Sequence, residues 1–304
     1  MAFRIAMTGA TGFVGTEVLE QALSEGLRVN ALTHTAQPPR ARLKWVPGSL
    51  EDTAALDTLV RDADAVVHIA GVVNAPDREG FEAGNAHGTM AVIDAVRRRG
   101  IRRLVHVSSL AAREPRLSDY GWSKQLAEKY VKASGLDWSI VRPPAIYGPN
   151  DREMLELFRM ARRGIMMLPP GGRLSVIHVT DLARLLLMLA QEKEASLTRT
   201  YEVDDGVSGG WDHKDFGIEI GRAMGRKVKV FATPKWLLSI AARADRMVRG
   251  RNAKLTPDRV NYFCHPNWVV GNRKQPPKRL WVPQVPTPDG LKATAAAYRE
   301  KGWL

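Results

Sequence analysis

Cysteine is almost absent from this 304-residue chain, which contains a single thiol at Cys264. One cysteine excludes an internal disulfide framework and is typical of a protein that works in a reducing compartment. Metal-ligand spacing is missing as well, because His178 and Asp181 supply two potential ligands while His213 and His265 stand apart from them. A protein metal site needs three or four ligands, so we predict no metal centre.

Long apolar runs are also missing. No stretch of the chain approaches the roughly 20 apolar residues that a membrane-spanning helix needs. The first predicted strand begins almost at Met1, which leaves no room for a signal peptide. We therefore expect a cytoplasmic protein, and its 44% hydrophobic content is enough for a sizeable core.

Acidic residues are scarce in one part of the chain. Residues 1–150 carry a net charge of +2 and residues 151–304 a net charge of +11. Within 222–279, 15 basic residues are accompanied by only Asp245 and Asp258. Such a field attracts anionic partners, but no zinc-finger, RNA-binding or basic-zipper motif accompanies it, so we predict no nucleic-acid binding. A peripheral contact with a membrane or a protein through this basic region stays open, as does a plain solvated surface.

Two features of the C-terminal third of the chain have alternative interpretations. Residues 234–248 show the pattern of a basic amphipathic helix, which could lie on an anionic membrane or over an apolar substrate. An ordinary packed helix is the simpler interpretation. Trp211, Trp236 and Trp268 could line an apolar substrate pocket, although a place in the core is the simpler role for at least two of them.

Glycine is concentrated near the beginning of the chain. Residues 3–7 alternate as a short strand, the segment Thr8-Gly9-Ala10-Thr11-Gly12-Phe13-Val14-Gly15 follows, and a helical pattern then begins. A strand, glycine-rich turn and helix present backbone N–H groups and the positive end of the helix to a phosphate. We therefore predict dinucleotide binding, and an ordinary turn that happens to contain three glycines is the alternative. The predicted contacts are Gly9, Thr11, Gly12, Phe13 and Val14.

Strand and helix patterns alternate through the first two-thirds of the chain. Apolar runs occur at 3–7, 27–32, 43–46, 65–69, 103–107 and 138–141, and segments of helical period separate them. This alternation predicts an α/β fold, a doubly wound parallel sheet of the Rossmann type. We predict a cofactor-binding domain over 1–204 and a smaller, partly helical substrate lobe over 205–304, to which 149–175 contributes.

The second predicted strand lacks an acid. An aspartate or glutamate at its end usually binds the ribose of NAD, whereas 27–35 contains neither. Thr33, His34, Arg40 and Arg42 are candidates to hold a 2′-phosphate, so we predict NADP as the cofactor, with NAD as the alternative. Ser49 and Leu50, which follow the third strand, are placed to flank the adenine.

A potential catalytic group follows the fifth apolar run. Ser109 ends this run, and Tyr120 and Lys124 lie four residues apart at the start of a helical pattern, on one face. A phenol is a poor acid–base at neutral pH unless a nearby ammonium favours its ionised form. A hydroxyl at the end of the adjacent strand can hold a substrate oxygen beside the phenol. The three side chains together predict carbonyl or alcohol chemistry, although an isolated Tyr-x-x-x-Lys is usually a surface pair.

These motifs together resemble the extended branch of the short-chain dehydrogenase/reductase superfamily, the NAD(P)-dependent epimerases, dehydratases and reductases. The motifs that carry the resemblance are Thr8–Gly15, Val67–Gly71, Asn85 with Gly88 and Thr89, the group Ser109, Tyr120 and Lys124, Arg142–Pro149 and Ile177–Ala183. The resemblance implies that Ser109, Tyr120 and Lys124 are catalytic. It also implies cofactor contacts from Ala70, Gly71, Tyr120, Lys124 and Pro143.

The chain departs from many extended members in two places. The loop between the catalytic serine and tyrosine is shortened to 110–119, and Ser49 stands where an aspartate is frequent beside the adenine. These departures favour the subgroup that resembles 3β-hydroxysteroid dehydrogenases, dihydroflavonol reductases and the reductase-like accessory subunit of respiratory complex I.

The function predicted from the sequence is an NAD(P)-dependent oxidoreductase that acts on the carbonyl or secondary alcohol of a small, apolar substrate. A nucleotide-sugar epimerase or dehydratase is the alternative among enzymes. A non-catalytic NADP(H)-binding subunit or sensor is the alternative outside them. We expect a monomer or homodimer, cytoplasmic or peripherally associated with a membrane.

Overall fold

The structure is a computed structural model that describes residues 2–192, 197–250, 253 and 255–304. The chain forms two compact units, the first made of Met1–Arg142 and Leu182–Tyr201 and the second of Pro143–Asp181 and Glu202–Leu304. The second unit thus contains all of 143–181, of which the sequence pattern singled out 149–175. The additional residues include two short strands that pair with each other inside the second unit.

A seven-stranded sheet forms the centre of the first unit, in the order β11-β6-β5-β4-β1-β2-β3. Its strands are β1 (Arg4–Thr8), β2 (Arg28–Thr33), β3 (Leu43–Pro47), β4 (Ala65–His68), β5 (Arg103–Val107), β6 (Asp137–Arg142) and β11 (Arg199–Glu202). All pairings from β6 through β3 are parallel. The strands read as nearly continuous apolar runs because both faces of the sheet are covered.

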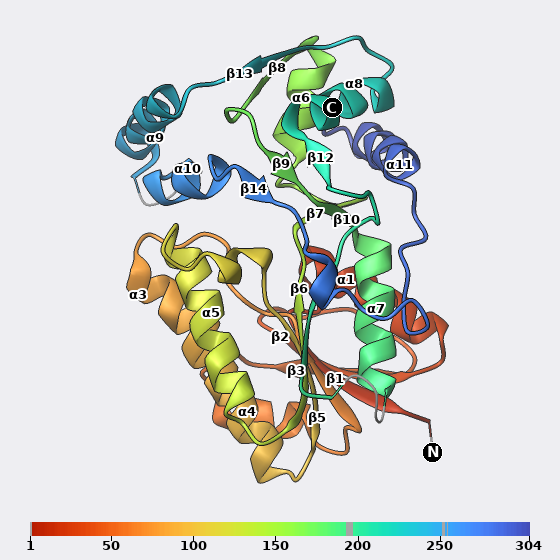
Figure 1. The fold of residues 1–304 in the computed structure, drawn as a ribbon. Coiled ribbons are helices and arrows are strands. Elements are labelled where there is room, and N and C mark those ends of the chain that lie inside the picture. The colour runs from red at the N-terminus through yellow and green to blue at the C-terminus, as the bar shows by residue number, and fades with distance from the viewer. Residues whose placement is uncertain (1, 193–196, 251–252, 254) are drawn as a thin grey trace. The chain divides into compact units, whose positions relative to one another are not determined.

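Helices cover both faces of this sheet, and Figure 1 shows α4 and α5 on one face and α1 and α7 on the other. The helices that belong to the first unit or end in it are α1 (Phe13–Ser24), α2 (Thr53–Leu59), α3 (Arg78–Phe81), the π-helix η1 (Glu82–His87), α4 (Gly88–Arg98), the 3₁₀ helix η2 (Leu110–Arg113), α5 (Asp119–Lys132) and α7 (Val179–Gln191). On the α4 face, Leu56 and Val92 pack against strand residues such as Val66 and Leu104. The predicted doubly wound Rossmann architecture is confirmed.

The strand order shows where this fold places a ligand. From β1 the chain adds β2 and β3 on one side, then crosses over and adds β4, β5 and β6 on the other. Ligands of doubly wound sheets bind outside the carboxyl ends of the strands at this point of reversal. In this chain the reversal lies between β1 and β4, where the glycine-rich turn leaves β1.

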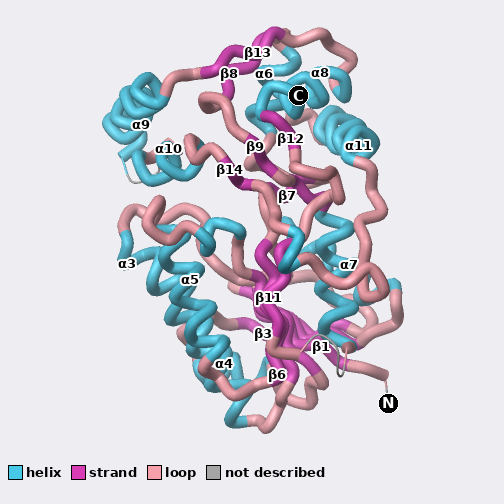
Figure 2. Tube along the Cα trace, viewed as in Figure 1, coloured by secondary structure: helices cyan, strands magenta, loops and turns pink. Residues whose placement is uncertain are grey.

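The second unit contains short strands, which Figure 2 shows as small magenta segments, and helices around a separate core. Its strands pair as β7 (Ala145–Tyr147) with β10 (Val176–His178), β8 (Ile165–Leu168) with β13 (Lys229–Ala232), and β9 (Arg173–Leu174) with both β12 (Trp211–Asp212) and β14 (Asn267–Trp268). Its helices are α6 (Leu155–Arg162), α8 (His213–Ala223), α9 (Lys235–Arg249), α10 (Pro257–Phe263), η4 (Asn272–Lys274) and α11 (Thr287–Glu300). Phe158, Ile220 and Tyr298 are central to the core of this unit.

The three tryptophans considered for a substrate pocket have different surroundings. Trp268 is buried beside Tyr262, and Trp211 is half-buried and donates its ring N–H to Asp205 at 2.7 Å. Trp236 is 65% exposed. No helix in the described part of the chain is both long and apolar enough to cross a bilayer, and the described residues contain no cluster of three His, Cys, Asp or Glu side chains suited to a metal.

Candidate active site

The turn after β1 is packed so tightly that only glycine fits at two positions. Gly9 has a φ of +75°, and a Cβ there would lie 2.7 Å from the Ala70 backbone nitrogen. A Cβ on Gly15 would lie 1.9 Å from the Gly9 carbonyl oxygen. Gly12 begins α1, and no described side chain caps this helix end. The first turn therefore offers free N–H groups and the positive helix dipole, which fits the pyrophosphate of a dinucleotide.

Hydrogen bonds join the carboxyl ends of β1 and β4 directly below this turn. The Thr8 hydroxyl accepts the Ala70 N–H at 3.2 Å and lies 2.7 Å from Nδ1 of His68. The other ring nitrogen of His68 lies 3.0 Å from the Thr89 hydroxyl, at the start of α4. The backbone around Ala70 and Gly71, predicted to lie beside the cofactor, is thereby held at the point of strand reversal.

Ser109 and Lys124 are both positioned at the carboxyl end of β5. Ser109 follows the strand and caps η2, where its Oγ accepts the Ala111 N–H at 3.2 Å. The start of α5 packs against η2, since a Cβ on Gly121 would lie 2.7 Å from the Ala111 carbonyl oxygen. Lys124 reaches back from α5, and its Nζ donates to the carbonyl oxygen of Val107 at 2.8 Å.

Tyr120 lies one turn before Lys124 on α5. Ser118 caps the helix by accepting the Gly121 N–H at 3.0 Å, so the helix begins just before the tyrosine. The Tyr120 ring is half-buried and packs 6.0 Å from the ring of Phe81, measured between centroids. Residues four apart on a helix share a face, so the phenol and the ammonium belong to the same side of α5.

The Lys124 ammonium is buried, with 5% of the residue exposed. Burial disfavours the charged form and lowers the pKa of Lys124 to about 8, while the carboxylate of Glu128 opposes this shift. Two buried histidines on adjacent strands, His68 and His106, lie behind it with ring centroids 5.3 Å apart. Burial, with a smaller contribution from Lys124, lowers the pKa of His68 to about 3 and that of His106 well below 6.5. Both histidines are therefore neutral around the lysine.

A buried ion pair supports α5 from the side of β6. Glu128 is fully buried and accepts two hydrogen bonds from Arg142, at 2.6 and 2.7 Å, and one from Ser108 at 2.7 Å. Burial alone would raise the pKa of Glu128, but the bonds from Arg142 and Ser108 hold it below its ordinary value. The sequence motifs contained Arg142 but gave no role to Glu128. Its signal is the spacing Lys124, Glu128, which puts a carboxylate on the buried side of the helix.

Asn85 connects three segments of the site. Its side-chain amide pairs with the backbone of Val72 through both of its polar groups, at 2.9 and 3.0 Å, and donates to Ser123 Oγ at 2.9 Å. Ser123 in turn donates to the Tyr120 carbonyl oxygen at 2.8 Å. A Cβ on Gly71 would lie 2.6 Å from the Asn85 side chain and 3.5 Å from Lys124 Nζ. Asn85 thus positions the loop after β4 against α5.

The four candidates for a 2′-phosphate do not gather at one place. Thr33, at the end of β2, is 3% exposed and donates its hydroxyl to the Thr35 carbonyl oxygen, whereas His34 is exposed. Arg40 forms an ion pair with Glu20 of α1. Arg42 accepts the Val29 N–H at its carbonyl oxygen, which places it at the amino end of the sheet.

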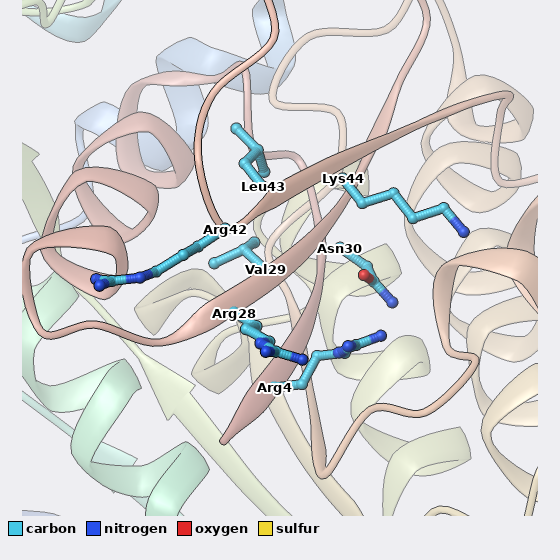
Figure 3. A pocket seen from close by; sticks show the side chains of 7 residues that line it. All are labelled: Arg4, Arg28, Val29, Asn30, Arg42, Leu43 and Lys44. Atoms are coloured by element: carbon cyan, nitrogen blue, oxygen red, sulfur yellow. The ribbon is translucent and has the colours of Figure 1, made fainter. Parts of the chain in front are cut away.

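Figure 3 shows Arg42 in an open pocket of about 410 Å³ at that end, with Arg4, Arg28 and Lys44. Arg4 and Arg28 begin their strands, whereas the ligand crevice lies where the strands end. This pocket is therefore not the cofactor site, and Arg42 is removed from the 2′-phosphate candidates. His34 is the exposed candidate at the correct edge.

The remaining cofactor candidates lie in loops that follow strands. Leu50 contacts the beginning of α4, where a Cβ on Gly88 would lie 2.7 Å from its Cδ1. Ser49 accepts the Glu51 N–H at 3.2 Å, and Pro143 directly follows the last residue of β6. These positions agree with cofactor contacts at the carboxyl ends of the strands and leave those contacts as predictions.

Comparisons with known proteins agree with this geometry. A family model described as NAD(P)H-binding matches residues 9–191. The ceramide reductase of Caulobacter vibrioides is 33% identical over 314 residues, covering 99% of this chain and 96% of that protein. A putative dihydroflavonol 4-reductase of Synechocystis is 28% identical over 223 residues, covering 64% of each chain.

Solved structures of extended family members share the fold. The Bordetella bronchiseptica enzyme WbmH, solved in complex with NAD⁺, has a TM-score of 0.75 at 20% identity, with 99% of this chain and 100% of that chain covered. The glycine turn, the strand order and the full-length relative point in the same direction. The chain belongs to the extended short-chain dehydrogenase/reductase superfamily and is an NAD(P)-dependent oxidoreductase of that type.

Proposed function

We propose that this protein uses NADPH to reduce the carbonyl group of an apolar, ceramide-like lipid to a secondary alcohol. The placement of Ser109 and Lys124 at the end of β5, with Tyr120 one turn away, is the observation that carries the carbonyl chemistry. The lipid class is supported by the ceramide reductase that this chain matches over 99% of its length.

In the proposed reaction, NADPH, when bound, would supply the hydride that adds to the carbonyl carbon. The Tyr120 hydroxyl donates its proton to the carbonyl oxygen, and the Ser109 hydroxyl donates a hydrogen bond to the same oxygen. The Lys124 ammonium, one turn from the phenol, stabilises the phenolate that remains. Because the Lys124 pKa is about 8, most of the lysine carries its charge at neutral pH.

The test uses the keto form of a short-chain ceramide, in which a ketone replaces the secondary alcohol, as the substrate. Its reduction is monitored through the loss of NADPH absorbance. Tyr120→Phe should lower kcat by about 10³-fold, within the range of general acid catalysis, while the NADPH-induced rise in melting temperature is retained. Tyr130→Phe is the matched control, because Tyr130 lies on the same helix but packs against the hydrophobic core. Full activity of Tyr120→Phe would refute the mechanism.

The choice of NADPH over NADH rests on the acid-free end of β2 and the exposed His34. We expect His34→Asp to shift the ratio of kcat/KM for the two cofactors towards NADH by about tenfold or more, because a carboxylate binds the ribose hydroxyls and repels a phosphate. An unchanged ratio would show that His34 does not face the 2′ position.

The second candidate is a nucleotide-sugar epimerase or dehydratase. Its support is a fold shared with enzymes of that class, such as a UDP-glucose 4-epimerase of Thermotoga maritima, with a TM-score of 0.75 at 17% identity. At that identity only the fold is shared. A ligand that binds the native state raises its melting temperature, so stabilisation by UDP-sugars and not by the ketone would favour this candidate. Tight NADPH binding without turnover of either substrate class would favour a non-catalytic subunit.

A further inference from the structure

Helix α9 turns an apolar face outwards. Trp236, Ile240 and Met247 are spaced so that they lie on one side of the helix, and they are 65%, 52% and 87% exposed. Ala242, the buried residue of this helix, projects from the other side. Surface helices normally direct the apolar stripe to the core and the polar side to solvent, whereas α9 exposes its large apolar side chains at these three positions. We call Trp236, Ile240 and Met247 the α9 apolar face.

The strand pair that leads into α9 also has an exposed apolar side. Helix α8 packs on one side of β8 and β13, where a Cβ on Gly217 would contact Leu168 and Val230. The opposite side carries Ile165, Met167 and Phe231, which are 51%, 53% and 52% exposed. Two residues, 233 and 234, separate β13 from α9, and Figure 1 shows the chain running from this strand directly to the helix. Exposed apolar side chains therefore continue along 229–248.

The polar residues of α9 are almost all cationic. Its exposed charged side chains are Lys235, Arg243, Arg246 and Arg249. Its acid, Asp245, is half-buried and is used within the unit, where it accepts the Leu255 N–H at 2.9 Å and pairs with Arg249 at 3.3 Å. An apolar face bordered by cations, with the carboxylate turned inwards, is complementary to a surface that is apolar below and anionic above.

We propose that α9 docks the protein on an anionic lipid bilayer, with its apolar face in the headgroup–acyl boundary and its cations among the phosphates. Amphipathic helices of this composition lie in the plane of the interface, and each basic residue near an anionic surface adds to binding. A second copy of the chain would bring the same cations into contact and is disfavoured by their repulsion. The proposal does not depend on the proposed reaction, so it is tested without substrate.

The experiment is sedimentation of the full-length protein with vesicles of phosphatidylcholine alone and with about one third phosphatidylglycerol. Binding should require the anionic lipid and fall with salt. The triple variant Trp236→Ser/Ile240→Ser/Met247→Ser should bind at least about tenfold more weakly. The charge variant Lys235→Gln/Arg243→Gln should bind about 25-fold more weakly at low salt, since each charge contributes roughly fivefold.

Matched controls separate this face from general effects. Met90→Ser removes an exposed apolar side chain of α4, and Lys129→Gln removes an exposed charge of α5; both should bind as the wild type does. An NADPH-induced rise in melting temperature confirms that each variant is folded. Wild-type protein that stays in the supernatant, or a triple variant that binds equally, overturns the proposal. Self-association abolished by the triple variant, without vesicle binding, would assign the face to a second copy instead and also overturns it.

Discussion

Replacing Lys124 with methionine should stabilise the cofactor-free protein. Burial lowers the pKa of Lys124 from 10.5 to about 8, and each unit of pKa corresponds to about 1.4 kcal/mol. Keeping the ammonium in the folded state at neutral pH therefore costs about 3 kcal/mol. Methionine removes this cost but leaves the Val107 carbonyl oxygen without the lysine donor, at a loss of about 1 kcal/mol. The expected net gain is about 2 kcal/mol.

The pH dependence identifies the cause of this gain. A folded-state pKa below the unfolded-state value means that the unfolded chain binds the extra proton between about pH 8 and 10.5, so wild-type stability rises through this window. The advantage of Lys124→Met should be full at pH 7 and shrink as the pH approaches 10.5. At neutral pH it should appear as a rise of roughly 4 °C in melting temperature.

Urea unfolding at pH 7 and pH 9.5, with and without the substitution, measures this effect. Lys129→Met is the control, because Lys129 lies on the same helix but is exposed, and it should give no gain at either pH. The reasoning is refuted if Lys124→Met is no more stable than the wild type at pH 7, or if its advantage is the same at both values. We expect Lys124→Met to lose reductase activity whether or not its stability rises. A variant that is more stable but inactive would show that the lysine lowers stability while it serves the proposed reaction.

Three further substitutions test the parts of the site that surround this lysine. His106→Phe should reduce the decrease in unfolding free energy that the wild type shows as the pH falls below about 6.5. The cause is that the histidine binds a proton in the unfolded chain but stays neutral when buried in the folded protein. Urea unfolding at pH 5 and pH 7 measures this decrease. Glu128→Gln should destabilise the protein by about 3 kcal/mol, because the buried guanidinium of Arg142 would lose the carboxylate of Glu128; a cost below 1 kcal/mol would contradict a buried pair. Gly15→Ala should abolish the thermal shift caused by NADPH, because its Cβ would meet the first glycine of the turn at 1.9 Å; Gly171→Ala, with open space around it, should keep the shift.

The local parts of the site could be predicted from sequence because each depends on neighbours in the chain. The glycine turn needs a strand before it and a helix after it, and both are visible as patterns around Gly9 and Gly15. Tyr120 and Lys124 share a helix face through their spacing alone. The parallel sheet follows from the alternation of strands and helices.

Other parts depend on pairing between distant segments. His68 and His106 become neighbours only through the register of β4 and β5, across 38 residues of chain. Arg42 was a candidate for the 2′-phosphate because it follows the second strand, but the loop crosses to the opposite end of the sheet before reaching it. Distance along the chain does not indicate at which end of a strand a loop residue lies.

Helix α9 shows a related limit of pattern reasoning. The period of Trp236, Ile240 and Met247 indicates an apolar side, and such a side normally packs inwards. The same period is compatible with an outward apolar side when another part of the helix supplies the packing surface. The less exposed side of α9 includes Ala242, which is buried, and Leu238, which is half-buried. The informative feature of the sequence is therefore the charge around the apolar stripe. Cations that outnumber acids around the stripe are complementary to an anionic surface. For the proposed contact of α9 with a bilayer, charge composition is therefore more informative than periodicity, because the same period is compatible with either orientation of the apolar side.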